Sequence, residues 1–187
     1  MTAPTRILLV SGSTRSGSTN TATLRAAQVA APKDVTAVLY DRLAELPAFN
    51  PDDDHDPLPP AVADLREQIA AADGVLFCTP EYAGALPGSF KNLLDWTVGG
   101  GEIYGKPVAW INVAAQGRGM NAAASLATVL SYVGATVVES ACADLFVPRD
   151  SVGPDGVVSH AELRAEIANV LRIFVDHIYA TSERSER

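Results

Sequence analysis

The stretch RILLVSGSTRSGSTN, residues 6–20, decides the fold. It starts with an apolar run at residues 7–10, continues as a loop of glycine and hydroxyl residues, and leads into an alanine-rich segment at residues 22–31. A buried strand, a tight polar loop and a helix start are typical of an anion cradle, in this order. The reason is that unpaired N–H groups point outward at a helix N-terminus, where the helix dipole favours negative charge.

The side chains of this loop suit a phosphate group. Ser13, Ser16, Ser18 and Thr19 offer hydroxyl donors, and Arg15 offers a full charge with a forked set of donors. The loop lacks the Gly-Lys-Ser/Thr end of an NTPase phosphate loop and the three-glycine dinucleotide fingerprint. We therefore predict a site for a terminal phosphate monoester. The alternative is a Ser/Gly-rich turn with ordinary helix capping.

The bulk composition limits the class of protein. The chain has 187 residues, which predicts one domain over residues 1–187. The net charge of −8 makes nucleic acid an unsuitable partner, since phosphate backbones require clustered Lys and Arg. Cys78 and Cys142 are too few for a disulfide framework or a zinc site, so we predict packing roles for both and no metal site.

No targeting or membrane segment is visible in the sequence. The N-terminal residues MTAPTR contain no apolar stretch, and no segment approaches the roughly 20 apolar residues of a membrane span. We therefore expect a cytoplasmic protein that has no membrane partner.

Strands and helices alternate along the chain. Strands are predicted at residues 7–10, 35–40, 75–79, 108–113 and 136–140, the last resuming around 143–147. Helices are predicted at residues 19–31, from near 60 to 72, at 89–97, at 120–133 with Gly134 as cap, and up to about 181, with Ser159 and Glu162 at capping-box spacing. This alternation predicts an α/β, flavodoxin-like three-layer sandwich around a five-stranded parallel sheet in the order 2-1-3-4-5.

Three polar loops follow neighbouring strands of this sheet. They span residues 11–20, 80–88 and 114–119, and the strand order brings them to one rim. In the second loop, Tyr82 can support a flat ring, although it can equally be a surface aromatic. The third loop, AAQGRG, has no aromatic side chain, so it leaves room for the edge of a large ring without covering the face of that ring.

Two of these stretches carry a family resemblance. The first loop, together with PEYAGALPGSFKNLLDW at residues 80–96, resembles the NADPH-dependent FMN reductase family of flavodoxin-like quinone, azo and chromate reductases. The family pattern Gly-Ser-x-Arg-x-x-Ser-x-Asn is met at residues 12–20. The second family pattern is met at Pro80, Glu81, Tyr82, Gly84, Pro87, Gly88, Lys91, Asn92, Asp95 and Trp96.

The resemblance implies an FMN-containing oxidoreductase that takes hydride from NADPH or NADH and passes electrons to a small acceptor, with no catalytic side chain. The residues implied to hold the phosphate are Ser13, Arg15, Ser18, Thr19 and Asn20. Those implied to line the ring are Pro80, Glu81, Tyr82, Ala83 and Gly84, with Gln116 and Gly117 at its other edge.

Some residues near these motifs have separate interpretations. Ala83 stands where the family usually has Asn, so one polar contact is expected to be missing. Arg118 is a candidate contact for the 2′-phosphate of NADPH. Asp95 and Trp96 are expected to seat their helix by packing or hydrogen bonding. His55, His160 and His177 are expected to lie away from the rim.

Two other functions stay open at this stage. A flavodoxin-type electron carrier usually sandwiches its flavin between aromatic rings, and the third loop offers none, which favours the enzyme. A regulatory or scaffold protein that has lost its flavin is the other alternative. By resemblance, the chain is also expected to form a homodimer or a dimer of dimers.

Overall fold

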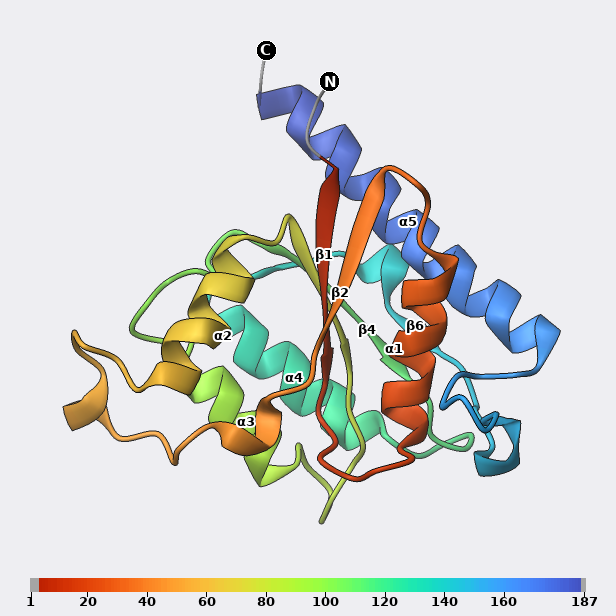
Figure 1. The fold of residues 1–187 in the computed structure, drawn as a ribbon, viewed down its shortest axis with the longest axis horizontal. Helices are drawn as coiled ribbons and strands as arrows, with labels where there is room; N and C mark the ends of the chain where they lie inside the picture. Colours follow the sequence, from red (N-terminus) through yellow and green to blue (C-terminus); the bar gives the residue numbers. More distant parts are fainter. Residues whose placement is uncertain (1–3, 186–187) are drawn as a thin grey trace.

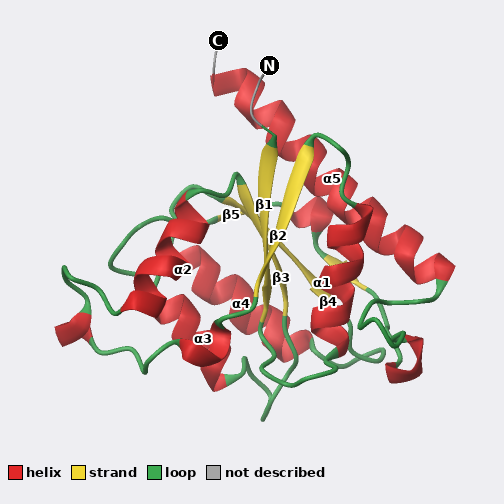
Figure 2. Ribbon diagram, in the orientation of Figure 1, coloured by secondary structure: helices red, strands yellow, loops and turns green. Residues whose placement is uncertain are grey.

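The computed structural model describes residues 4–185, and its centre is a parallel sheet in the order β2-β1-β3-β4-β5. The predicted order is confirmed. Each strand is short, the central strands β1, β3 and β4 are mostly buried, and Figures 1 and 2 show helices on both sides of the sheet. The strands are β1 (Thr5–Ser11), β2 (Val35–Tyr40), β3 (Gly74–Cys78), β4 (Pro107–Asn112) and β5 (Thr136–Val137).

The fifth position of the sheet is divided between two short strands. β5 pairs with the start of β4 through Pro107 and Thr136, whereas β6 (Ala143–Asp144) pairs with its end through Ile111 and Ala143. A 3₁₀ turn, Glu139–Ala141, separates them. The predicted interruption is therefore confirmed, although both pieces are shorter than expected.

Helices cover both faces of the sheet (Figure 1). α1 (Thr19–Ala30) and α5 (Ala161–Ser185) lie on one face, and α2 (Pro60–Ala70), α3 (Gly88–Asp95) and α4 (Met120–Tyr132) lie on the other. No helix within residues 4–185 combines the length and hydropathy that a bilayer span requires.

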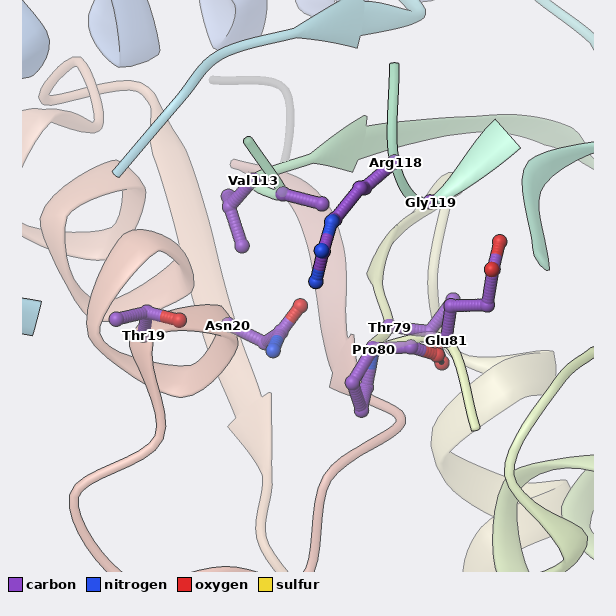
Figure 3. Close-up of a pocket in the computed structure, with 9 residues that line it drawn as sticks. Thr19, Asn20, Thr79, Pro80, Glu81, Val113, Arg118 and Gly119 are labelled. Atoms are coloured by element: carbon purple, nitrogen blue, oxygen red, sulfur yellow. Dashed lines mark hydrogen bonds between the residues drawn. The ribbon is translucent and has the colours of Figure 1, made fainter. Parts of the chain in front are cut away.

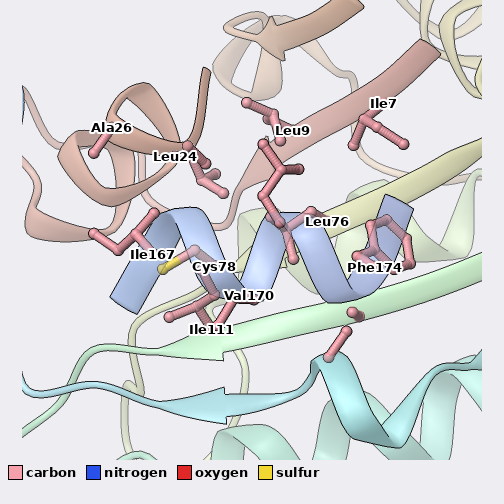
Figure 4. Close-up of a cluster of buried hydrophobic side chains, with 14 of the residues drawn as sticks. Ile7, Leu9, Leu24, Ala26, Leu76, Cys78, Ile111, Ile167, Val170 and Phe174 are labelled. Atoms are coloured by element: carbon pink, nitrogen blue, oxygen red, sulfur yellow. The ribbon is translucent and has the colours of Figure 1, made fainter. Parts of the chain in front are cut away.

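The core consists of two apolar layers that meet at β1. Ile7 and Leu9 pack toward α1 and α5, as Figure 4 shows, while Leu8 and Val10 pack toward the other three helices. Because β1 buries both faces, its sequence is a continuous apolar run rather than an alternating one.

The helix ends confirm one capping prediction and correct another. Gly134 has φ +71°, its N–H donates to the carbonyl of Ser131, and the N–H of Ala135 donates to that of Leu130, which is a Schellman cap for α4. The prediction of a capping box at Ser159 was wrong. The hydroxyl of Ser159 donates to the carbonyl of Ser151 at 2.9 Å, because this segment folds back on the preceding loop before α5 starts.

Candidate functional site

The three polar loops meet in one pocket at the carboxyl ends of β1, β3 and β4. The N–H of Gly12 donates to the carbonyl of Cys78 at 2.9 Å, which holds the first loop beside the start of the second. The pocket has a volume of about 280 Å³ (Figure 3). It is lined by Thr19, Asn20, Thr79, Pro80, Glu81, Val113, Ala114, Arg118 and Gly119.

The first loop presents the uncapped N-terminus of α1 to this pocket. Ser18 is the N-cap residue, yet its side chain makes no capping hydrogen bond to the helix backbone. Its hydroxyl accepts instead from the Asn20 amide at 3.4 Å, and the Asn20 carbonyl oxygen accepts from the Cys78 thiol at 3.3 Å. The first-turn N–H groups are therefore available to an anion, which argues against ordinary helix capping.

The five residues predicted to surround a phosphate are not all in one pocket. Thr19 and Asn20 line the pocket described above, and Ser18 is buried beneath the loop. Ser13 and Arg15 line a neighbouring hollow of about 230 Å³ on the side of β2. The loop therefore presents its polar side chains on two sides, a division that sequence spacing did not indicate.

The second loop is a two-residue hairpin at Ala83 and Gly84. The N–H of Tyr82 donates to Ala85 at 3.0 Å, and the N–H of Ala85 donates back at 3.1 Å. Ala83 has φ +51° and Gly84 has φ +73°, as a type I′ turn requires. Such turns favour Asn-Gly, which supplies a backbone reason for the Asn that the family usually has at this position. The side chain of Tyr82 is 53% exposed and stands outside the pocket lining.

Glu81 has a structural contact that the sequence did not reveal. Its carboxylate accepts hydrogen bonds from the backbone N–H groups of Asn121 and Ala122 at 3.0 and 3.1 Å. These are first-turn groups of α4, whose N-cap residue, Gly119, has no side chain to offer them. Glu81 therefore joins the second loop to α4 while it lines the pocket.

Asn112 organises the third loop and was also missed. It is only 7% exposed. Its amide nitrogen donates to the carbonyl of Arg118 at 3.0 Å and to the carboxylate of Asp144 at 2.8 Å, and its oxygen accepts from the N–H of Ala114 at 3.2 Å. Gly119, at φ +79°, lies so close that a Cβ there would collide with the Asn112 side chain. One buried amide thus sets the course of residues 113–119.

The third loop contributes other residues to the pocket than those predicted. Gln116 and Gly117 are exposed and stand outside the pocket lining, whereas Ala114, Arg118 and Gly119 form part of it. Figure 3 shows the Arg118 side chain directed into the pocket toward Asn20. A role for Gln116 and Gly117 at a ring edge therefore stays a prediction.

Comparison with known proteins now decides the family. A sequence model of the NADPH-dependent FMN reductase family matches residues 5–144, most of the chain. The chain belongs to this family. It is 31% identical over 188 residues to a 2-hydroxy-1,4-benzoquinone reductase of Burkholderia sp, covering 97% of this chain and 98% of that protein.

Two further relatives support this assignment. The chain is 41% identical over 112 residues to an NAD(P)H-dependent FMN reductase of Pseudomonas aeruginosa, and that match covers 59% of this chain and 60% of that protein. The fold matches FerB, a flavoenzyme NAD(P)H:(acceptor) oxidoreductase from Paracoccus denitrificans, with a TM-score of 0.82 and 28% identity over 94% of this chain and 98% of that one.

Two further motif residues of the FMN reductase family, Asn92 and Trp96, hold α3 against the connector after β2. The indole N–H of Trp96 donates to the carbonyl of Pro47 at 2.9 Å, and the ring meets that of Phe49 edge to face. Asn92 donates to the same Pro47 carbonyl and accepts from the N–H of Phe49. Asp95 pairs with Lys91 on its own helix at 2.5 Å. The predicted packing role is thus confirmed for Trp96.

The cysteines and histidines are not part of the pocket lining. Burial raises the pKa of the Cys78 thiol, so it stays protonated and acts as a donor to Asn20. Burial also raises the pKa of Cys142. The three histidines are absent from the pocket lining, as expected: His55 is in the connector after β2, His160 precedes α5, and His177 is on α5.

Proposed function

We propose that this protein is an NAD(P)H-dependent, FMN-containing oxidoreductase. Its electron acceptors would be small molecules such as quinones, azo compounds, metal oxyanions or free flavin. The observation that carries the proposal is that the uncapped N-terminus of α1 meets parts of the second loop (Pro80 and Glu81) and of the third loop (Ala114, Arg118 and Gly119) in one pocket. The printed activities of the relatives, FMN reductase and benzoquinone reductase, agree with it.

The residues present fit FMN. The free N–H groups at the start of α1 suit its phosphate, with Thr19 and Asn20 in the same pocket. Ser13, Arg15 and Ser18 are proposed to approach the phosphate from the rest of the first loop. The N-terminus of α1, at Thr19, gives this part of the pocket a positive bias, whereas the first-turn N–H groups of α4 are already bound by the Glu81 carboxylate. A dianionic phosphomonoester is the kind of group that such a site stabilises.

The ring of FMN fits the part of the pocket formed by the second and third loops. Pro80, Glu81, Tyr82, Ala83 and Gly84 would line it mainly through backbone groups, because the Glu81 carboxylate is already bound to α4. On the opposite side, Gln116 and Gly117 are proposed to approach its edge.

FMN, when bound, supplies the hydride and electron transfer. The protein supplies position and electrostatics. The rigid hairpin at Ala83 and Gly84 and the loop held by Asn112 would orient the ring, and nearby backbone N–H groups would stabilise negative charge on it. No side-chain nucleophile is assigned, since the cysteine near the pocket, Cys78, is buried and protonated.

An enzyme and an electron carrier differ in access to the ring. The segment from Ala114 to Gly119 carries no aromatic side chain, so it leaves a face of the ring open to a nicotinamide. A carrier that sandwiches its flavin between aromatic rings has no such opening. This difference favours the enzyme.

Anaerobic mixing tests the proposal. The purified protein, loaded with FMN, is expected to show flavin absorbance that bleaches within seconds of adding NADPH or NADH and returns on adding a quinone. Bound FMN that is not bleached would identify a carrier instead. Protein that neither carries nor takes up FMN would contradict both and indicate a scaffold.

The homodimer or dimer of dimers is likewise a proposal. Sedimentation at micromolar concentration measures the oligomeric state directly. A single species at the monomer mass of 19.6 kDa would contradict the proposed oligomer.

A further inference from the structure

We propose that Cys78 is a positioning residue for the FMN phosphate, acting through the side-chain amide of Asn20. The inference rests on the proposed function, since it concerns the phosphate end of the same pocket. It assigns no chemical step to the sulfur atom. The thiol holds the Asn20 amide in the orientation that offers an N–H group, rather than an oxygen atom, to an anion.

Cys78 and Asn20 meet where the end of β3 lies beside the start of α1. Cys78 is the last residue of β3, and Asn20 is in the first turn of α1. Both are buried, with 0% and 6% of their surfaces exposed. The Cys78 thiol donates to the side-chain oxygen of Asn20 at 3.3 Å. Burial raises the pKa of this thiol, so the sulfur keeps the proton that the contact needs.

The nitrogen end of the same amide is held by Ser18. The Nδ2 atom of Asn20 donates one of its two N–H groups to the Ser18 hydroxyl at 3.4 Å. The side chain of Asn20 is therefore anchored at both ends, by β3 and by the first loop. Within residues 4–185 the second N–H group of Nδ2 has no acceptor, and Figure 3 shows the side chain directed into the pocket.

The Asn20 amide lies beside the site proposed for the phosphate. The backbone N–H of Asn20 is one of the first-turn groups of α1, and no side-chain cap satisfies them. An anion bound at this helix start is therefore within reach of the Asn20 side chain. A phosphate oxygen accepts from an N–H group and is repelled by an amide oxygen, so the orientation of the amide decides whether Asn20 favours or opposes binding.

The thiol is the contact that selects this orientation. The Ser18 hydroxyl can accept from an amide nitrogen or donate to an amide oxygen, so it suits either end of Asn20. Without a donor at position 78, turning the amide would exchange one buried contact for another of similar energy. Asn20 would then present its oxygen to the anion in a large share of the molecules.

Riboflavin gives a test that is specific to the phosphate, because it has the ring of FMN without the phosphate. The ratio of the FMN to the riboflavin association constant is measured by fluorescence titration. Cys78→Ala is expected to lower this ratio about two- to fivefold, because the competent orientation of Asn20 becomes less populated. Cys78→Ser keeps a donor, so its ratio is expected to stay near that of wild type. Asn20→Ala removes the amide itself and is expected to lower the ratio at least about tenfold.

Two controls separate positioning from packing. Cys142→Ala is the matched variant, because this second cysteine packs against the same apolar layer and donates to the carbonyl of Val138 at 3.6 Å, outside the pocket lining. It is expected to leave the ratio unchanged, even where urea unfolding shows an equal loss of stability. The second control is Cys78→Ala in an Asn20→Ala background, where no further fall of the ratio is expected.

Three results would overturn the role of Cys78. An unchanged ratio in Cys78→Ala would reduce the thiol to a packing group. A fall of the same size in the Asn20→Ala background would show that the thiol does not act through Asn20. Wild type that binds riboflavin as tightly as FMN would show that the pocket does not hold the phosphate. If wild type binds neither flavin, the proposed function itself fails, which distinguishes that failure from the failure of this inference.

Discussion

The carboxylate of Glu81 accepts a hydrogen bond from the backbone N–H of Asn121 at 3.0 Å, across 40 residues of sequence. Together with the bond from Ala122, it supplies α4 with the cap that Gly119 lacks. One side chain therefore stabilises a helix end and fixes the distance between two walls of the pocket.

Replacing Glu81 tests this dual role. Glu81→Ala is expected to lower the free energy of unfolding by about 1–2 kcal/mol, the usual effect of losing an N-terminal cap. Glu81→Gln keeps an acceptor oxygen, so its free energy of unfolding is expected to fall by about half as much as that of Glu81→Ala. Urea unfolding measures both values, and FMN affinity should fall in parallel because the second loop loses its link to α4.

Glu67→Ala is the matched control, since Glu67 is exposed on α2. It is expected to change stability by less than about 0.5 kcal/mol. Equal losses in the Glu81 and Glu67 variants would show that the contact to α4 contributes nothing specific.

The hairpin in the second loop carries local strain at Ala83. A side chain at φ +51° is unfavourable by about 1–2 kcal/mol, and Asn tolerates this region better than Ala. Ala83→Asn is therefore expected to raise the free energy of unfolding by about 0.5–1 kcal/mol. Ala85→Asn, in the same hairpin but without a positive φ, should give no such gain. A less stable Ala83→Asn variant would contradict the strain at this turn.

Asn112 supports the third loop from inside. Asn112→Ala removes two donated and one accepted hydrogen bond at a buried position. We therefore expect the free energy of unfolding to fall by about 2 kcal/mol or more. Thermal unfolding measures it, with the exposed α5 residue Asn169→Ala as control. FMN affinity should also fall, because Arg118 and Gly119 lose their anchor. Unchanged stability and affinity would mean that the loop keeps its course without Asn112.

The buried side chain of Tyr40 predicts that the stability of the fold depends on pH in the alkaline range. Burial, with a further contribution from Asp64, raises the pKa of Tyr40 to about 12. The unfolded chain loses this proton near pH 10 and the folded chain does not. The protonated Tyr40 therefore contributes its full share to the free energy of unfolding below about pH 10, and this contribution is lost as the pH rises toward about 12.

Tyr40→Phe removes both this dependence and an unpaired hydroxyl. The Tyr40 oxygen is buried with no hydrogen-bond partner in the described structure, so Phe should be more stable by about 1 kcal/mol at pH 8. Its loss of stability between pH 10 and 12 should also be smaller. Tyr132→Phe, at an exposed position on α4, serves as control. A less stable Tyr40→Phe at pH 8 would show that the hydroxyl forms a favourable interaction after all.

Much of the fold could be predicted from local pattern. The run at residues 7–10 is apolar on both faces, and its burial in β1 between two layers of helices confirms that interpretation. Helix ends were predicted to within a few residues where the cap is local, as at Gly134. The interpretation failed at Ser159, where a contact with Ser151 replaced the local capping pattern.

By itself, the sequence determined the order of elements, the family, and which three loops form the rim, because apolar periodicity, turn residues and motif spacing are properties of neighbouring residues. Only the tertiary structure decided that the first loop divides its polar side chains between two hollows, that Glu81 caps α4, and that Asn112 fixes Arg118. These depend on where the ends of side chains meet across strands, and a hydrogen bond between residues 40 positions apart leaves no periodic signal in the sequence.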